Sequence, residues 1–355
     1  MSFLNPDPVQ ISVDLLKELI AIPSVSRGEE AAAKHIYQFL EMYGMEAGSD
    51  HHNVWAYAPM FDADKPTLML NSHIDTVQPV DGWQTDPFQP VEKAGCIYGL
   101  GSNDAGASLV CLIAAFIQLS RHQQPYNLLF LASAEEEVSG ENGIRRILPS
   151  LPPISFALVG EPTGMQPAIA EKGLMVLDMV STGASGHAAR EEGDNAIYKA
   201  LEDIAWFRDY RFPLHSELLG AVKMSVTQIS AGTQHNVIPG ECRCVVDIRS
   251  NECYTNEQIL QTVRQHVRSQ VTPRSLRLCS TATPPNHNLV KRALEMGRKP
   301  FGSPTLSDQA LMDFPSMKMG PGESSRSHTA NEYIRISEIA EAIEVYFDLL
   351  NGTVI

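Results

Sequence analysis

Three short apolar runs that each lead into charged side chains constrain this chain more than any other feature. Residues 67–70 lead to His73 and Asp75, residues 127–132 lead to the acidic run 135–137, and residues 156–159 lead to Glu161. Short runs that stay apolar without alternation are typical of strands buried on both faces, as in parallel sheets. In open α/β sheets, ligands bind at the carboxyl ends of such strands. We therefore predict an α/β fold with a doubly wound, mostly parallel sheet whose carboxyl edge carries the functional site.

The middle third of the chain has a different texture. Strand-like segments at 174–180, 222–226 and 241–249 alternate between apolar and polar residues, and helices are expected at 195–207 and 255–268, with a strand at 275–278. Alternation predicts sheets with one covered face, so residues 173–281 are expected to form a separate α+β domain. It would be inserted into a catalytic domain made of residues 1–172 and 282–355, and a length of 355 residues suits two domains.

Composition excludes several classes of partner. Lys and Arg number 27 against 42 Asp and Glu, and the formal charge of −15 argues against nucleic acid. The start of the chain lacks the pattern of a secretion signal, and no apolar run reaches the ~20 residues needed to span a bilayer. Six cysteines show no CxxC spacing, so core packing is the preferred interpretation of Cys242 and Cys244. We expect a cytoplasmic protein without a membrane partner.

Metal-binding side chains recur at the ends of the predicted strands. A histidine beside a carboxylate is more often an ordinary hydrogen-bonded pair, and an acidic run is usually a solvated helix start. The Gly-rich segment 98–107 lacks the GxxxxGK[ST] pattern of a phosphate loop. Two imidazoles and three carboxylates would suit two Zn²⁺ ions, with one carboxylate bridging, and Co²⁺ or Mn²⁺ could substitute. The predicted ligands are His73, Asp104, Glu136, Glu161 and His328. In contrast, His51 and His52 are interpreted as an exposed loop pair, since neither ends a strand.

Such a centre still needs a proton acceptor. Metal ions lower the pKa of bound water towards ~7, and a general base must carry the proton to the leaving nitrogen. Of the two adjacent glutamates, Glu136 is assigned as the ligand and Glu135 as the base. Asp75 is expected to accept the N–H of His73 and fix its tautomer. The residues together predict metal-assisted hydrolysis of an amide.

The motifs and their order resemble the dinuclear-zinc aminoacylase and carboxypeptidase family, which includes acetylornithine deacetylase and succinyl-diaminopimelate desuccinylase. Residues 72–77 (SHIDTV) resemble the family's HxD segment, Glu135-Glu136 its Glu-Glu pair, residues 160–163 (GEPT) its GEPT segment, and residues 327–329 (SHT) its final histidine motif. The resemblance implies a zinc-peptidase-like catalytic domain, a bridging role for Asp104, and an inserted domain that acts as a lid and makes a homodimer.

The resemblance also implies roles within the inserted domain. His187 would reach the active site of the partner subunit and polarise the substrate carbonyl, although a surface-loop histidine is an alternative. Asn236 would lie near the reacting carbonyl and Arg249 would bind a substrate carboxylate, although Arg249 also fits a plain exposed strand position. After Asp104 the family commonly shows Met-Lys-Gly, whereas this chain has Ala-Gly-Ala, a departure that bears on substrate preference.

The substrate is expected to be a small N-acyl amino acid. An acetylornithine deacetylase-like activity in arginine biosynthesis is the main interpretation, because the length, the GEPT segment and the SGHAAR run at 185–190 are similar to that branch. A succinyl-diaminopimelate desuccinylase and a dipeptidase or carboxypeptidase are the enzymatic alternatives. A catalytically silent relative that binds amino acids is the alternative from another class, but no predicted ligand or base is missing.

Overall fold

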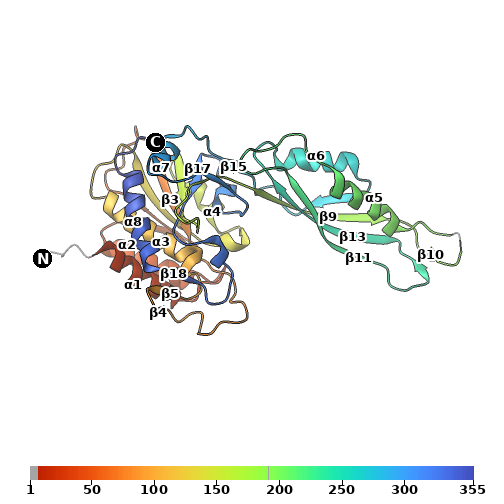
Figure 1. Cartoon of the computed structure of the whole chain (residues 1–355), viewed down its shortest axis with the longest axis horizontal. Coiled ribbons are helices and arrows are strands. Elements are labelled where there is room, and N and C mark those ends of the chain that lie inside the picture. Colours follow the sequence, from red (N-terminus) through yellow and green to blue (C-terminus); the bar gives the residue numbers. More distant parts are fainter. Residues whose placement is uncertain (1–6, 191) are drawn as a thin grey trace. The chain divides into compact units, whose positions relative to one another are not determined.

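The chain folds into two units in the computed structural model, which describes residues 7–190 and 192–355 (Figure 1). The first unit holds the described residues up to Ile169, together with Thr283–Phe301 and Ser307–Ile355. The second holds Ala170–Ala282 and Gly302–Leu306. The sequence analysis had placed the boundaries after residues 172 and 281 and had assigned 302–306 to the catalytic domain. Residues 1–6, where that domain was expected to start, lie outside the described residues.

The first unit is built on a mixed sheet with a parallel centre. Its four central strands run in the order β6-β3-β7-β17 and are parallel, whereas β1 and β2 extend one side in antiparallel fashion. The bounds are β1 Glu46–Asp50, β2 Asn53–Tyr57, β3 Thr67–His73, β6 Asn127–Ser133, β7 Phe156–Val159 and β17 Ser316–Lys318. The predicted α/β class with a mostly parallel sheet is confirmed.

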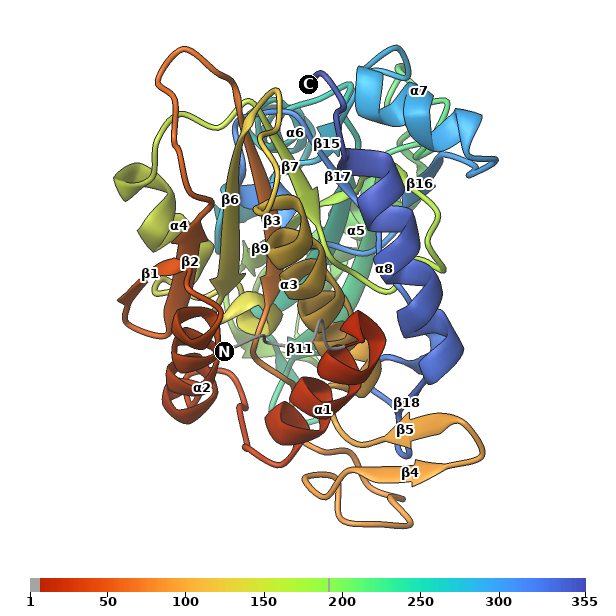
Figure 2. The same ribbon diagram turned by 90° about the vertical axis from the view of Figure 1, so that its left-hand side faces the viewer.

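Helices cover both faces of this sheet, which explains why its central strands are apolar throughout. Leu68 and Leu70 on β3 pack into a core formed with the helices of one face, whereas Met69 between them packs into a second core on the other face with α4 (Ile144–Ile147). Figure 2 shows α3 and α8 in front of the sheet, on this first face. The helices of that face are α1 Pro8–Ile20, α2 Glu30–Met42, α3 Ala107–Leu119, α7 Asn288–Glu295 and α8 Ile336–Leu350.

One helical stretch, Ser102–Leu119, is long and apolar enough to cross a membrane. However, 83% of that span is buried inside the protein, so it is a core helix of the first unit. A small antiparallel sheet of β4 (Val91–Lys93), β5 (Cys96–Tyr98) and β18 (Tyr333–Arg335) lies at the loops next to this helix. It brings the segment before α3 beside the segment that follows His328.

The second unit is an antiparallel sheet with two helices. Its strands run in the order β11-β13-β9-β14 and bury one face against α5 (Ala196–Asp209) and α6 (Asn256–His266). The bounds are β9 Gly173–Thr182, β11 Lys223–Ala231, β13 Glu241–Ser250 and β14 Gln270–Pro273. Cys242 and Cys244 lie in this core, as core packing requires. The strand expected at 275–278 is wrong: the strand on this side of β9 is β14, which ends at Pro273, and residues 275–278 form no strand.

Candidate metal centre

Five metal-binding side chains meet at the carboxyl edge of the parallel strands in the first unit. His73 is the last residue of β3, and the turn after β6 and the end of β7 supply one glutamate each from the two neighbouring strands. Asp104 comes from the irregular first turn of the stretch that leads into α3, where its backbone is not helical (φ −122°, ψ 99°), and His328 comes from the loop before β18. The parallel register therefore gathers residues that are far apart in the sequence.

The ligand atoms form two groups that share Asp104. His73 Nε2 lies 3.2 Å from Asp104 Oδ1 and 3.9 Å from Glu161 Oε1. His328 Nε2 lies 3.7 Å from Asp104 Oδ2 and 3.0 Å from Glu137. Ligand atoms about 2.0–2.2 Å from one cation are separated by distances of this size. The two oxygens of Asp104 thus face two histidines, which is the arrangement that a bridging carboxylate needs.

Within the acidic run, the structure differs from the expected register. The carboxylate that lies with His73 and Asp104 belongs to Glu137, whereas Glu136 had been expected there. Glu135 is 5% exposed, and its carboxylate accepts hydrogen bonds from Asn142 N (3.3 Å) and Nδ2 (3.0 Å). Glu135 also has a left-handed backbone (φ 53°) at the start of this turn. Glu136 is the remaining half-buried glutamate beside the centre.

Asp75 supports the centre in two ways. His73 Nδ1 donates to the Asp75 carbonyl at 2.9 Å, and the Asp75 carboxylate lies slightly farther away, at 3.4 Å. That bond places the proton on Nδ1 and leaves Nε2 to face the ligand group. The carboxylate accepts from the backbone N–H groups of Glu136 (3.0 Å) and Glu137 (3.1 Å) and from Ser26 Oγ (2.7 Å). Asp75 therefore connects the end of β3 to the acidic turn, a role that sequence analysis missed.

Glu332 was also missed, and it holds the loop that carries Asp104. Its buried carboxylate accepts from the backbone N–H groups of Gly101 (3.0 Å), Asn103 (2.7 Å) and Asp104 (2.9 Å). Burial raises its pKa to about 7. The available signal was an isolated acid four residues after His328 in a segment without regular structure.

Negative charge is concentrated at this edge of the sheet. Burial, together with the charge of Asp104, raises the pKa of Glu161 to about 8. Burial also holds the pKa of Glu136 well above its usual range, and Glu161, Asp308 and Glu137 add to that rise. Burial alone would lower the pKa of His73, but Asp104 and Asp75 outweigh it and raise that pKa well above normal. A bound cation would relieve this repulsion, so the donor set fits divalent metal ions.

Three predicted residues lie in the second unit, and the structure brings two of them together. His187 is exposed on β10 (Gly186–His187), which pairs with β12 (Val237–Ile238), and Asn236 O accepts from Ala188 N at 3.0 Å. Arg249, near the end of β13, pairs with Leu174 at the start of β9. His187 instead follows the opposite end of β9, which stops at Thr182. Its guanidinium forms a two-point contact with Asp247 at 2.9 and 3.1 Å.

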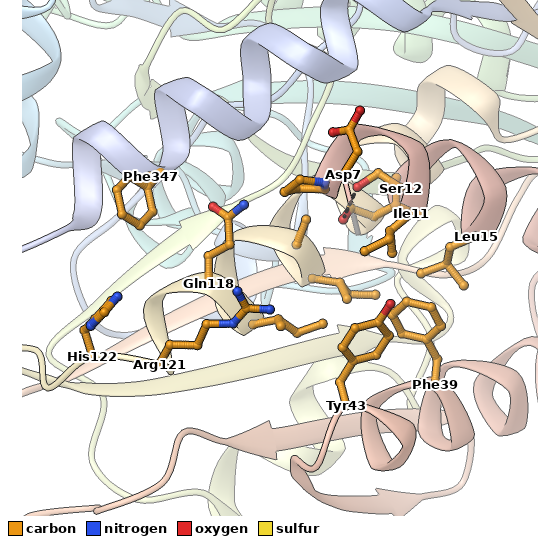
Figure 3. A pocket seen from close by; sticks show the side chains of 15 residues that line it. Asp7, Ile11, Ser12, Leu15, Phe39, Tyr43, Gln118, Arg121, His122 and Phe347 are labelled. Carbon is orange, nitrogen blue, oxygen red and sulfur yellow. Dashed lines mark hydrogen bonds between the residues drawn. The ribbon is translucent and has the colours of Figure 1, made fainter. Parts of the chain in front are cut away.

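A pocket elsewhere in the first unit has different chemistry (Figure 3). It has a volume of about 340 Å³ and lies between α1, α2, α3 and α8, with Leu15, Phe39 and Phe347 among its apolar walls. Asp7 is its lining carboxylate, and that side chain accepts from Val9 N at the start of α1. The described walls hold no cluster of metal-binding side chains, so the chemistry of the protein is assigned to the edge of the sheet.

We expect the metal-free protein to lose stability as the pH rises from about 5 to about 8. In the folded protein the pKa of Asp308 is raised to about 6, that of Glu332 to about 7 and that of Glu161 to about 8, chiefly by burial. The folded state therefore keeps protons that the unfolded chain has released, so the contribution of these three acids to stability is greatest below their ordinary pKa and falls as the pH rises. The raised pKa values of His73 and His328 act in the same direction. The lowered pKa values of Asp75 and Asp104 act only below this range.

Calorimetric melting of metal-stripped protein across this pH range, beside Zn²⁺-loaded protein, checks the expectation. The metal-free Tm should fall by several degrees, whereas metal should flatten or reverse the trend because it binds the deprotonated ligands. A metal-free Tm that rises with pH would contradict the assigned electrostatics.

Comparison with known proteins identifies the family. The family model described as "Peptidase family M20/M25/M40" matches residues 69–352. A succinyl-diaminopimelate desuccinylase of Nitratiruptor sp. is 27% identical over 269 residues, covering 72% of each chain. Succinyl-diaminopimelate desuccinylase 2 of Ruegeria sp. is 25% identical, covering 97% of this chain and 94% of that protein. These relatives favour the desuccinylase alternative over the acetylornithine deacetylase interpretation and give no support to a place in arginine biosynthesis.

Solved structures share the fold. Aminopeptidase PepT of Bacillus cereus superposes with a TM-score of 0.75 at 19% identity, covering 96% of this chain and 98% of that one. The YxeP protein of Bacillus subtilis, described as a dinuclear metal-binding peptidase, superposes with a TM-score of 0.73 at 17% identity, covering 97% of both chains. Since the family model matches most of the sequence and the ligand group lies at the edge of its sheet, the chain is a metal-dependent hydrolase that belongs to peptidase family M20/M25/M40.

Proposed function

We propose that this protein removes a succinyl-type acyl group from the nitrogen of an amino acid. The observation that carries the chemistry is the pair of ligand groups that share Asp104, beside a half-buried glutamate. The acyl group is inferred from the relatives, which are named succinyl-diaminopimelate desuccinylases. We propose the cytoplasm as its location, because all six cysteines are free thiols.

The five ligands divide between two ions. His73, Asp104 and Glu161 would hold one divalent cation, and Asp104, Glu137 and His328 the other. When bound, such cations polarise the scissile carbonyl and lower the pKa of a water at the centre. Zn²⁺ suits a set of imidazole and carboxylate ligands, and Co²⁺ or Mn²⁺ would be accepted by the same side chains.

Glu136 is the proton carrier in this proposal, in place of Glu135. It lies next to the ligand Glu137 in the sequence. The carboxylate of Glu135, in contrast, is engaged by the two hydrogen bonds from Asn142. A carboxylate can accept a proton in one step of the reaction and donate it in the next. It would take the proton from water at the centre and deliver it to the leaving nitrogen.

A substrate panel tests the function. Release of free amine should be measured for N-succinyl, N-acetyl and N-formyl amino acids and for dipeptides, with Zn²⁺, Co²⁺ or Mn²⁺ added to metal-stripped protein. We expect the highest kcat/KM for an N-succinyl amino acid and no turnover without metal. Faster hydrolysis of dipeptides would replace the deacylase by a peptidase, and faster hydrolysis of N-acetyl substrates would restore the deacetylase.

The role of Glu136 predicts a contrast between neighbouring variants. Glu136→Gln should keep its metal and lower kcat by about 10²–10⁴, because the amide keeps the shape but cannot accept a proton. Glu135→Gln should stay within several-fold of wild type, because its carboxylate serves the turn through Asn142. Metal content and kcat of the purified variants check this contrast. If Glu135→Gln were the inactive variant, the base would return to Glu135.

We also propose that the second unit makes a homodimer and that His187 serves the centre of the partner subunit. β11 is an edge strand of its sheet, and large apolar side chains are exposed on it and on the adjacent helix α5: Ile229, Tyr198 and Leu201. An apolar surface beside an open strand edge is typical of an interface. His187 is exposed and close in sequence to that sheet, and Asn236 lies beside its strand. Arg249 stays a weaker candidate for a substrate carboxylate, because Asp247 already binds it.

Mixing two inactive variants tests this geometry. His187→Ala should lower kcat by about 10²–10³ without loss of metal, since a donor to a developing oxyanion has about that effect. In a heterodimer with Glu136→Gln, one site carries both defects and the other carries neither, so activity should reappear. A confirmed heterodimer that stays inactive would show that His187 serves its own subunit or has no catalytic part.

A further inference from the structure

The acidic turn of the first unit, residues 134–137, is held in place by hydrogen bonds from its backbone N–H groups. Four consecutive N–H groups, those of residues 134–137, donate to buried side chains. Ala134 N donates to Asn53 Oδ1 (3.0 Å), and Glu135 N donates to Glu29 Oε1 (3.2 Å). The next two N–H groups donate to the two oxygens of Asp75. The path of the turn is therefore fixed by acceptors from three other parts of the unit.

Glu29 is the acceptor in this set that the catalytic proposal leaves unused. It precedes α2, its side chain is fully buried, and its Oε1 also accepts from Arg27 N at 2.7 Å. Its other oxygen, Oε2, lies 2.7 Å from Nδ1 of His52. The sequence interpretation of His51 and His52 as an exposed pair holds for His51 but is wrong for His52, which is half-buried against this carboxylate.

Glu29 accepts its hydrogen bond from Glu135, the residue of the turn that has an unusual backbone conformation. Glu135 is left-handed (φ 53°, ψ 25°), which residues other than glycine adopt rarely and which needs support from surrounding structure. In this turn the Glu135 carboxylate accepts from Asn142 Nδ2, Glu137 lies with His73 and Asp104, and Glu136 is close enough to interact electrostatically with His73 and Glu161. An extended Glu135 would redirect both of them.

We propose that Glu29, oriented by His52, is a positioning residue for the hydrolysis: it holds Glu135 in its left-handed conformation and thereby aims Glu136 and Glu137 at the metal centre. The proposal deepens the proposed function and rests on it for the catalytic part. The contacts run from His52 through Glu29 to the Glu135 N–H, all within the first unit. Substitutions of groups that orient metal ligands typically cost 10- to 100-fold in metal affinity or activity.

A purely structural role for Glu29 is the competing explanation, since it also holds the loop before α2 through Arg27 N. Such a role would lower the Tm without changing the metal ligands of the folded protein. Metal affinity and the Co²⁺ absorption spectrum separate the two roles, because they report the ligand set directly. Neither readout requires a known substrate, so a failed substrate panel would leave this test intact.

The experiment titrates metal-stripped protein with Co²⁺ and compares Glu29→Ala with Glu29→Gln. In Glu29→Ala, the ion that depends on Glu137 should bind 10- to 100-fold more weakly, with a changed spectrum. On the best substrate of the panel, kcat should fall by about the same factor with little change in KM, because Glu29 lies behind the turn. Glu29→Gln should stay within a few-fold of wild type, because its amide oxygen can accept from Arg27 N and Glu135 N while its NH₂ group faces His52.

Glu18→Ala is the matched control, since Glu18 forms the same kind of pair with His35 (2.8 Å) on the exposed side of the unit. It should bind both ions like wild type. Unchanged Co²⁺ binding in folded Glu29→Ala would overturn the proposal, as would Glu29→Gln behaving like Glu29→Ala.

If Glu29→Ala does not fold, His52→Ala provides the test. Its partly exposed ring can be removed without touching the buried acceptors, and the ion that depends on Glu137 is expected to bind a few-fold more weakly. Unchanged Co²⁺ binding in His52→Ala would then overturn it.

Discussion

The structure of the first unit depends on keeping several carboxylates close together at one edge of a sheet. Asp104 faces His73 with one oxygen and His328 with the other, and Glu137 and Glu161 complete the two groups. Without cations, His73 helps to keep these carboxylates ionised, but burial and the charge of Asp104 still raise the pKa of Glu161 to about 8. Bound cations would offset the repulsion among these carboxylates. This expectation is consistent with the family of metal-dependent hydrolases to which the chain belongs.

The turns that carry the ligands are stabilised by hydrogen bonds from main-chain N–H groups to other buried carboxylates. Glu332 accepts from the loop of Asp104, Asp75 accepts from Glu136 and Glu137, and Glu29 accepts from Glu135. Each carboxylate thus satisfies backbone donors that would otherwise be buried without a partner, and it fixes where the next side chain points. The ligands themselves stay available for metal, because the orienting bonds go to the backbone. The same device recurs in segments that are distant in sequence.

Much of this organisation was predictable. The apolar runs ending at His73 and Glu161 predicted the parallel strands, because only strands covered on both faces lack alternation. The ligand types at their ends predicted a metal site. The register within the acidic run was not predictable in the same way: three identical glutamates offer no pattern, and the left-handed Glu135 that selects Glu137 is supported by Glu29, a residue about a hundred positions away. His52 was misjudged for the same reason, since its partner Glu29 becomes a neighbour only through folding.

By itself, the sequence determined the fold class, the existence of an inserted α+β unit and the kinds of side chain at the centre. These properties follow from local periodicity and residue chemistry, which are present in the chain before it folds. Only the tertiary structure decided which glutamate joins His73 and Asp104, which carboxylates hold the turns, and that Arg249 is engaged by Asp247. Those outcomes depend on hydrogen bonds between segments far apart in the chain, and their partners are brought within reach only when the parallel strands align.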